Sequence, residues 1–191
     1  DILVGTQMIA KGHDFPLVTL VGVLAADAAL SMPDFRAAER TFQLLTQVAG
    51  RSGRGDRPGE VIIQSFFPDH YTFQLACTQK FEEFYARESR YRKAMFYPPF
   101  TAIAGILVTD RDKERAALES RSVSDYLDSI RGDSVRILGP APAPLERVKR
   151  LHRYQLLIKA GSRSTLHRVL SALRAHLDGK KLGSTRVLVD V

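Results

Sequence analysis

Two arginines, each beside a glycine, close a helix-like stretch of this sequence. Residues 47–54 read QVAGRSGR, which places Arg51 and Arg54 three residues apart. Glycine lets a ligand approach the main chain closely, and the guanidinium presents a rigid fork of donors that matches phosphate oxygens. Two such forks suit a site where negative charge develops on a transferring phosphoryl group. A solvated basic turn after a helix is the alternative interpretation, and the octapeptide alone favours neither.

A second polar stretch, upstream, carries a cation and a carboxylate. In the run 10–16, Lys11 offers a point charge and Asp14 an acceptor for hydroxyl groups. Thr6 follows the short apolar run 2–4, where a parallel strand would reach the ligand edge of a sheet. Taken alone, the Lys-Gly-x-Asp pattern is a weak signal and more typical of an ordinary polar loop.

The elements that would hold these residues belong to an α/β sheet. Continuous apolar runs at 2–4 and 18–26 predict buried parallel strands, and 60–66 predicts another. Between them a helix begins near Pro33 and Asp34, since proline and acid both suit a first turn. Gln47 lies on its polar stripe, at the helix end. Its buried stripe is predicted to comprise Phe35, Ala38, Phe42, Leu45 and Ala49.

The stretch 69–99 predicts a bridge to a second domain. Helical spacing of Phe73, Cys77, Phe81, Phe84 and Glu88 predicts one long amphipathic helix, with Cys77 at a core position. The run 97–100, Tyr-Pro-Pro-Phe, stops that helix, because proline disfavours helix in the residue before it. We therefore expect regions 1–68, 69–99 and 100–191.

Residues 100–191 predict a small α+β domain of the split β-α-β, ferredoxin-like pattern. The element order is β-α-β-β-α-β. Strands are expected at 100–109, 135–138, 147–159 and 186–191, and helices at 112–130 and around 166–177. The run 139–144, Gly-Pro-Ala-Pro-Ala-Pro, is predicted to be a stiff extended connector.

The charge is placed unevenly along the chain. Residues 1–68 hold 6 Lys and Arg against 7 Asp and Glu, whereas residues 69–191 hold 22 against 14. A basic second half fits a polyanionic partner such as nucleic acid, although charge alone also fits a merely basic surface. A single cysteine excludes an internal disulfide or a cysteine-based metal cluster in these 191 residues. No apolar run reaches the length that spans a bilayer, so no membrane partner is expected.

Two candidate binding sites lie in the second half. The densest basic cluster can neutralise phosphates, and Tyr154 can stack a base; the alternative is a solvated hairpin with a structural tyrosine. The run 161–166 predicts a helix start capped by Ser162 or Ser164, where Arg163 and His167 share a face that suits a carboxylate. An ordinary capped helix explains this run equally well. The cluster comprises Arg147, Lys149, Arg150, His152 and Arg153.

Several stretches together resemble one family of superfamily 2 helicases. QVAGRSGR at 47–54 resembles helicase motif VI, and Thr6 with Lys-Gly-His-Asp at 11–14 resembles motif V. With GTQM at 5–8, KGHDFP at 11–16 and DFRAAER at 34–40, the match narrows to the primosomal protein N′ family of replication-restart DNA helicases. The Tyr-Pro-Pro-Phe run, the Gly-Pro-Ala-Pro run and Arg-Tyr-Gln at 153–155 extend the resemblance along nearly the whole chain.

The resemblance implies a role for each matching residue. Arg51 and Arg54 would contact the γ-phosphate of ATP, Arg54 as the arginine finger, beside Gly50. Gln47 would couple the nucleotide state to closure of two lobes. Asp14 would lie near the ribose, and Thr6 and Lys11 near the backbone of the tracked DNA strand. Arg163 and His167 would receive the acidic tail of single-stranded DNA-binding protein.

The resemblance also implies what the intact protein does. A cytoplasmic, ATP- and Mg-dependent 3′-to-5′ helicase would remodel stalled forks and help primosome proteins assemble. The sequence contains neither the G-x-x-x-x-G-K-[ST] phosphate loop nor the family's zinc-binding cysteines, so we expect the closing half of a second RecA-like lobe, within a C-terminal fragment inactive alone. The alternative is a nucleic-acid-binding module whose helicase lobe no longer hydrolyses ATP.

Overall fold

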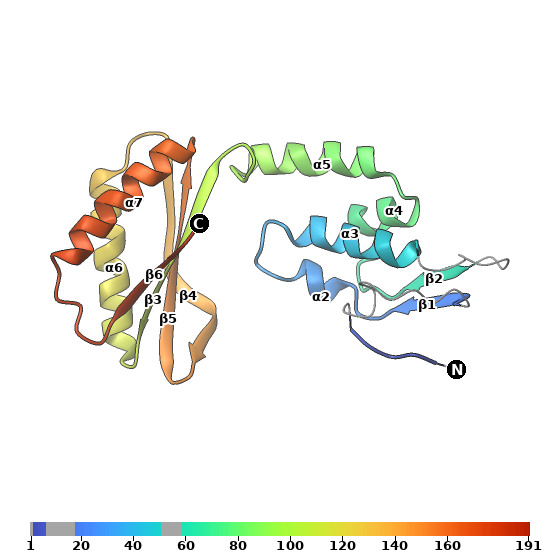
Figure 1. Cartoon of the computed structure of the whole chain (residues 1–191), viewed down its shortest axis with the longest axis horizontal. Helices are drawn as coiled ribbons and strands as arrows, with labels where there is room; N and C mark the ends of the chain where they lie inside the picture. The colour runs from blue at the N-terminus through green and yellow to red at the C-terminus, as the bar shows by residue number, and fades with distance from the viewer. Residues whose placement is uncertain (1, 7–17, 51–58) are drawn as a thin grey trace. The chain divides into compact units, whose positions relative to one another are not determined.

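The chain folds into two compact units, Asp1–Tyr91 and Arg92–Val191. The computed structural model describes residues 2–6, 18–50 and 59–191. The fold is mixed α/β, with a two-stranded parallel sheet in the first unit and a four-stranded antiparallel sheet in the second (Figure 1). The first unit contains β1 (Leu20–Val23), α2 (Asp27–Leu30), α3 (Ala37–Ala49), β2 (Glu60–Ile63), α4 (Tyr71–Cys77) and most of α5 (Phe81–Ala94).

The parallel sheet pairs β1 with β2, from Leu20 opposite Glu60 to Val23 opposite Ile63. Val23 and Ile63 pack against the core beneath α3, while Leu20 and Ile62 are more than half exposed. The prediction of a strand buried on both faces over 18–26 is therefore wrong in extent and burial. Only one face of this sheet receives a helix among the described residues, so the strands alternate in exposure.

The predicted strand at 2–4 is wrong. These residues have no regular secondary structure, and Ile2, Leu3 and Val4 are 93, 62 and 85% exposed. A strand exists only where a neighbouring strand pairs with it, and neither β1 nor β2 pairs with this run. The prediction failed because an apolar run does not reveal whether a pairing strand is present.

Helix α3 follows the predicted amphipathic pattern closely. Phe42 and Leu45 are buried, and the Phe42 ring stacks on Phe84 of α5 at 4.1 Å. Val48 rather than Ala49 closes the buried stripe. Asp34 precedes the helix: its carboxylate accepts a hydrogen bond from the Arg36 N–H and pairs with Arg40 at 2.8 Å. An acid at the positive helix end is the arrangement that the sequence predicted.

The single long helix predicted after residue 70 is two helices. Gln79 takes the left-handed conformation (φ 52°), and the Lys80 N–H donates to the Leu75 carbonyl across the break. This hydrogen bond ends α4 as a Schellman motif, a role usually filled by glycine. Because α4 ends there, Cys77 is exposed rather than in the core, which corrects that prediction. The hydroxyl of Tyr71 donates to the Glu88 carboxylate at 2.7 Å and joins the two helices.

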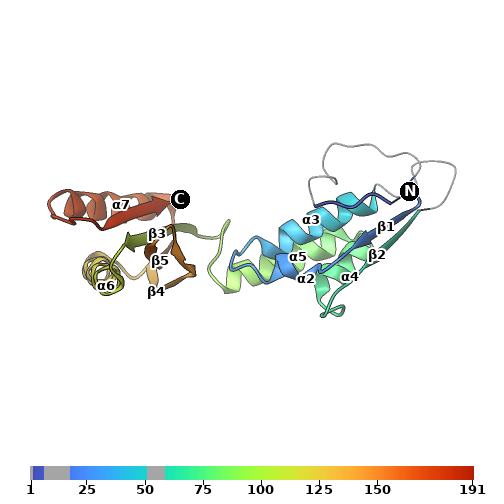
Figure 2. The ribbon, with the colours of Figure 1, turned by 90° about the horizontal axis from the view of Figure 1, so that it is seen from below.

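The second unit runs β-α-β-β-α-β, as predicted. Its helices α6 and α7 cover one face of a sheet with strand order β4-β5-β3-β6 (Figures 1 and 2). Ile106, Val108, Ile158 and Leu127 lie in the core between sheet and helices, each at most 1% exposed. The elements are β3 (Ala102–Asp110), α6 (Lys113–Ile130), β4 (Val135–Val148), β5 (Leu151–Ala160), α7 (Arg163–Asp178) and β6 (Arg186–Asp190).

The predicted connector at 139–144 is part of a strand. β4 continues through it to Val148 and pairs with β5, with register shifts between Leu138 and Ala141 and between Pro142 and Arg147. Proline is tolerated because β4 is an edge strand, where one side of the backbone needs no partner. Gly139 supplies a positive φ of 99° at the first shift. The predicted strand start at 147 is likewise wrong, because residues 149 and 150 form the turn that joins β4 to β5.

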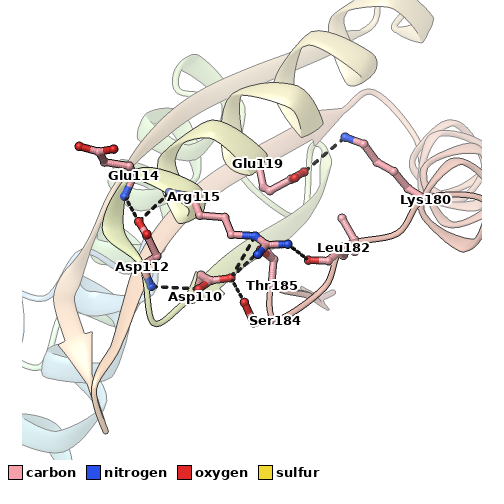
Figure 3. Close-up of polar contacts among 9 residues, drawn as sticks. All are labelled: Asp110, Asp112, Glu114, Arg115, Glu119, Lys180, Leu182, Ser184 and Thr185. Carbon is pink, nitrogen blue, oxygen red and sulfur yellow. Dashed lines mark hydrogen bonds and ion pairs between the residues drawn. The ribbon is translucent and has the colours of Figure 1, made fainter.

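The loop between α7 and β6 is fastened to the corner between β3 and α6 (Figure 3). The Asp110 carboxylate is 1% exposed and accepts hydrogen bonds from the Ser184 and Thr185 hydroxyls and the Asp112 N–H. The Arg115 guanidinium donates to the Leu182 carbonyl at 3.1 Å. These contacts fix where β6 begins, and therefore which residues of β6 lie beside β3.

Candidate functional site

Helix α3 carries the first of the predicted nucleotide-site residues. Gln47 lies in its last turn and is exposed, on the polar side that the sequence predicted. Gly50 caps the helix with a φ of −73°, a conformation that any residue adopts. A Cβ there would stand 3.5 Å from the Thr46 carbonyl oxygen, an ordinary contact. The backbone conformation therefore does not require glycine at this position.

The structure describes only some of the other residues predicted to contact the nucleotide or the tracked DNA strand. Lys11, Asp14, Arg51 and Arg54 lie outside the described residues. Thr6 lies within them, exposed and outside any helix or strand. Gln47 and Gly50 thus mark, among the described residues, where the Gly-Arg turn begins.

Asp27 holds the carboxyl ends of β1 and β2 together, a role that the sequence did not reveal. Its carboxylate is 8% exposed and accepts hydrogen bonds from the Ser65 hydroxyl at 2.5 Å and the Phe66 N–H at 2.8 Å. The Ser65 hydrogen bond, helped by the N–H groups of Phe66 and Phe67 and opposed by burial, lowers the pKa of this carboxyl. The signal was an acid shortly after a strand, near the edge where open α/β sheets bind ligands.

A small cavity opens beside Asp27. Its volume is about 70 Å³, and it is lined by Ala25, Asp27, Gln64, Ser65 and Phe66. Both carboxylate oxygens of Asp27 are already hydrogen-bonded, and the space holds little more than a few atoms of a ligand. We therefore assign Asp27 to positioning the strand ends rather than to binding.

The predicted basic cluster occupies the β4–β5 hairpin. Val148 pairs with Leu151, so Lys149 and Arg150 form a two-residue turn with φ values of 49° and 65°. Two positive φ values are typical of a type I′ turn, in which Asn-Gly is the usual pair. Two exposed cations therefore lie at the hairpin tip, in left-handed backbone conformations that glycine or asparagine usually adopts.

Strand alternation separates two of the predicted residues. Arg153 pairs with Thr109 and Tyr154 pairs with Val108, so their side chains leave opposite faces of the sheet. Arg153 donates to the Leu145 carbonyl of β4 at 3.3 Å. Arg147 pairs with His152 and, by the same alternation, lies on the face of Tyr154. The structure therefore brings Arg147, Lys149 and Arg150 together at the tip but sets Tyr154 on the opposite face from Arg153.

The start of α7 matches its sequence prediction. The Ser162 hydroxyl accepts the Thr165 N–H at 3.1 Å and is the N-cap of α7. Arg163 and His167 are both exposed and lie one turn apart on the helix. The first turn contains no acidic residue, so the positive helix end is not neutralised from within its own turn.

Among the residues that the structure describes, no three His, Cys, Asp or Glu side chains group in a way that could hold a metal ion. None of the helices that the structure describes has both the length and the apolar character needed to cross a bilayer.

The chain is similar over most of its length to bacterial replication proteins. Replication restart protein PriA of Bacillus subtilis is 47% identical over 176 residues, which cover 92% of this chain and 22% of that protein. The PriA proteins of Chlamydia muridarum and Haemophilus influenzae are 41% and 39% identical over all 191 residues. These matches cover 25% and 26% of those proteins, so the chain spans about a quarter of the relatives' length.

The second unit carries the family signature. Residues 93–191 match the family model described as the primosomal protein N C-terminal domain. That match begins within α5 and includes β3 to β6 with both helices between them. The chain corresponds to the C-terminal portion of replication restart protein PriA, and it belongs to the primosomal protein N C-terminal domain family.

Proposed function

We propose that this chain is part of an ATP-dependent 3′-to-5′ DNA helicase that remodels stalled replication forks and promotes primosome assembly in the bacterial cytoplasm. The observation that carries this proposal is the match of the whole chain to replication restart proteins, with the Gln-x-x-Gly-Arg-x-Gly-Arg pattern intact at 47–54. ATP and Mg²⁺ would be the cofactors of the intact protein, and zinc would be bound by parts other than this sequence.

The two units would play different parts. The parallel β1–β2 sheet with α3 packed on one face would form part of the closing half of a second RecA-like lobe. The strand order β4-β5-β3-β6 and the order β-α-β-β-α-β support a ferredoxin-like fold for the second. We place the functional regions at 1–68, 69–99 and 100–191, with the middle region as a bridge.

The nucleotide site would lie at the end of α3. Arg51 and Arg54 would contact the γ-phosphate, Arg54 as the arginine finger, and Asp14 would lie near the ribose. Gln47, exposed in the last turn of α3, would couple the nucleotide state to closure of the two lobes. The backbone at Gly50 tolerates a side chain. We therefore infer that glycine serves there to let a ligand approach the main chain closely.

The second unit would bind DNA and a protein partner at separate places. Lys149 and Arg150 at the hairpin tip would contact phosphates together with Arg147 and Arg153, and Tyr154, on the opposite face of the sheet from Arg153, would stack a base. Thr6 and Lys11 would contact the tracked strand in the first unit. The exposed start of α7 would receive the acidic tail of single-stranded DNA-binding protein through Arg163 and His167.

The arginine finger gives the sharpest test of the proposal. In the full-length protein, Arg54→Ala should lower DNA-stimulated ATP turnover by roughly 10²-fold or more, with little change in DNA affinity. Arg57→Ala, which removes a neighbouring arginine outside the pattern, is the matched control and should turn over normally. ATP hydrolysis near the wild-type rate in Arg54→Ala would reject the assignment. Absence of hydrolysis by the wild-type full-length protein would favour the non-hydrolysing DNA-binding module instead.

A further inference from the structure

The four-stranded sheet has one face that its own helices leave open. Within residues 92–191, all of which the structure describes, α6 and α7 pack on the same face (Figure 2). Alternation along β3 sends Ala104, Ile106 and Val108 into that core, and sends Leu107 and Thr109 to the open face. The residues paired with Leu107 and Thr109 on neighbouring strands therefore share this open face.

Two arginines flank Thr109 on the open face. Thr109 pairs with Arg153 of β5 on one side and with Arg186 of β6 on the other. Since neighbouring strands lie about 4.8 Å apart, the two arginine backbones are about 10 Å apart across the sheet. Thr109 is only 5% exposed although no helix of this unit covers it, as expected when long side chains lie over it from both sides.

These arginines have no carboxylate partner among the described residues. The Arg153 guanidinium donates to the Leu145 carbonyl, which leaves most of its five N–H donors available, and the Arg186 side chain makes no hydrogen bond or ion pair with another described residue. The two acids at this end of β3 are used internally: Asp110 accepts from Ser184 and Thr185, and Asp112 accepts from the first N–H groups of α6.

The surroundings favour a nucleic acid as the occupant. Residues 92–191 hold 19 Lys and Arg against 10 Asp and Glu, a net charge of +9. The hairpin tip, with Lys149 and Arg150, lies three to four residues before Arg153 along the chain. In the adjacent row Leu107 pairs with Leu188, which is 55% exposed. An unpaired strand can lay its bases on such an apolar surface, whereas a duplex keeps its base faces stacked inside.

We propose that Arg186 and Arg153 form one phosphate-binding row with Lys149 and Arg150, and that a single strand of DNA lies across this end of the sheet. The row rests on the DNA binding proposed above for the hairpin and extends it two strands further, to β6. Sequence spacing could not reveal Arg186 as a member, because only the strand register places it beside Arg153.

Fluorescence anisotropy with the whole 191-residue chain tests the row. The probes are a labelled oligothymidylate and a labelled duplex of equal length, titrated over a range of salt concentrations. Arg186→Gln should weaken oligothymidylate binding by roughly two- to fivefold, as for the loss of one exposed ion pair. It should also reduce the slope of log affinity against log salt by about 0.7, and Arg153→Gln with Arg186→Gln by about 1.4. Arg121→Gln, an exposed arginine in the middle of α6, is the matched control and should bind like the wild type.

The outcomes separate the row from the hairpin. If Arg186→Gln binds DNA like Arg121→Gln, while the double variant Lys149→Gln with Arg150→Gln binds more weakly, the row is rejected. DNA binding by the hairpin is then retained without Arg186. If the wild-type chain binds no DNA at low salt, both DNA binding by the hairpin and the phosphate-binding row are rejected. Equal affinity for duplex and oligothymidylate, or for polyglutamate of matched charge, would also reject a single-strand site. Circular dichroism of each variant confirms that its fold is intact.

Discussion

The Thr185 hydroxyl, just before β6, donates a 2.7 Å hydrogen bond to the Asp110 carboxylate at the end of β3. The Ser184 hydroxyl donates to the same carboxylate oxygen at 2.9 Å (Figure 3). Burial alone would raise the pKa of this carboxyl. The donors, with Arg115 nearby, outweigh burial and lower the pKa to about 2. A single ionised side chain thus joins the end of β3 to the start of β6, the edge strand that carries Arg186.

Replacing that charge should destabilise the second unit. In Asp110→Asn the side chain loses an acceptor while two hydroxyl donors stay nearby, which should cost about 2 kcal/mol or more of unfolding free energy. Asp125→Asn on α6, an exposed acid with no contact assigned, should change stability by less than about 0.5 kcal/mol. Chemical denaturation followed by circular dichroism measures both variants. Equal stability of the two would show that the Asp110 contacts contribute nothing.

Acid should weaken the same contacts. The carboxyl of Asp110 has a pKa of about 2 in the folded chain against an ordinary value of 3.8, so the folded state binds the proton less tightly. Its contribution, about 2 kcal/mol, is therefore complete above the ordinary value and is lost as pH falls from 3.8 towards 2. Hydrogen exchange of β3 amides at several acidic pH values measures this loss. Asp110→Asn should show a smaller pH dependence over that range, and an unchanged one would contradict the assignment.

Two glycines of the same sheet should respond oppositely to alanine. A Cβ on Gly139 would lie 2.7 Å from the Gln155 carbonyl oxygen, and its φ of 99° disfavours any side chain. Gly139→Ala should therefore cost about 2 kcal/mol or more. At Gly105, in the middle of β3, no atom stands within 4 Å of an added Cβ. Gly105→Ala should be neutral or stabilise by up to about 1 kcal/mol, because glycine weakens a strand interior. Thermal unfolding compares the two, and a similar shift in both would reject the steric argument.

Lys159 should hold the segment before β3 against the sheet. Its ammonium donates to the Met95 carbonyl at 2.9 Å and lies 3.6 Å from the centre of the Tyr97 ring. Burial, with the nearby Arg136 charge, lowers the pKa of this lysine. Lys159→Met keeps most of the apolar stem but loses both contacts, so amide exchange over residues 95–100 should accelerate. Lys113→Met, an exposed lysine at the start of α6, should leave that exchange unchanged. Equal amide exchange rates over residues 95–100 in both variants would show that Lys159 does not hold this segment against the sheet.

Some elements were predictable because local chemistry specifies them. Apolar periodicity over 112–130 predicted α6, and the structure confirms that helix with Ala116, Val123 and Leu127 buried. The break at Gln79 was missed, since glutamine is not the residue that a left-handed helix end normally carries. The run 2–4 was misjudged for another reason: strand formation depends on a partner strand, which no local pattern encodes.

The candidate sites show the same division. Gln47 was correctly placed on the exposed side of a helix end, because helical periodicity fixes its face. The positions of Arg153, Tyr154 and Arg186 depend on the register between strands far apart in the sequence. Because Arg153 and Tyr154 are adjacent in a basic run, the sequence suggested one site, whereas strand alternation puts them on opposite faces and strand register puts Arg153 and Arg186 on either side of Thr109.

The prolines of β4 bear on how copies of this domain meet one another. Pro140, Pro142 and Pro144 lie on an outer strand of the sheet, and none has an N–H to offer an incoming strand. Outer strands are the usual route by which sheets of neighbouring molecules join edge to edge and grow into fibres. Over residues 140–144 this margin of the sheet therefore offers few donors for such growth, which disfavours edge-to-edge joining of two copies through the middle of β4.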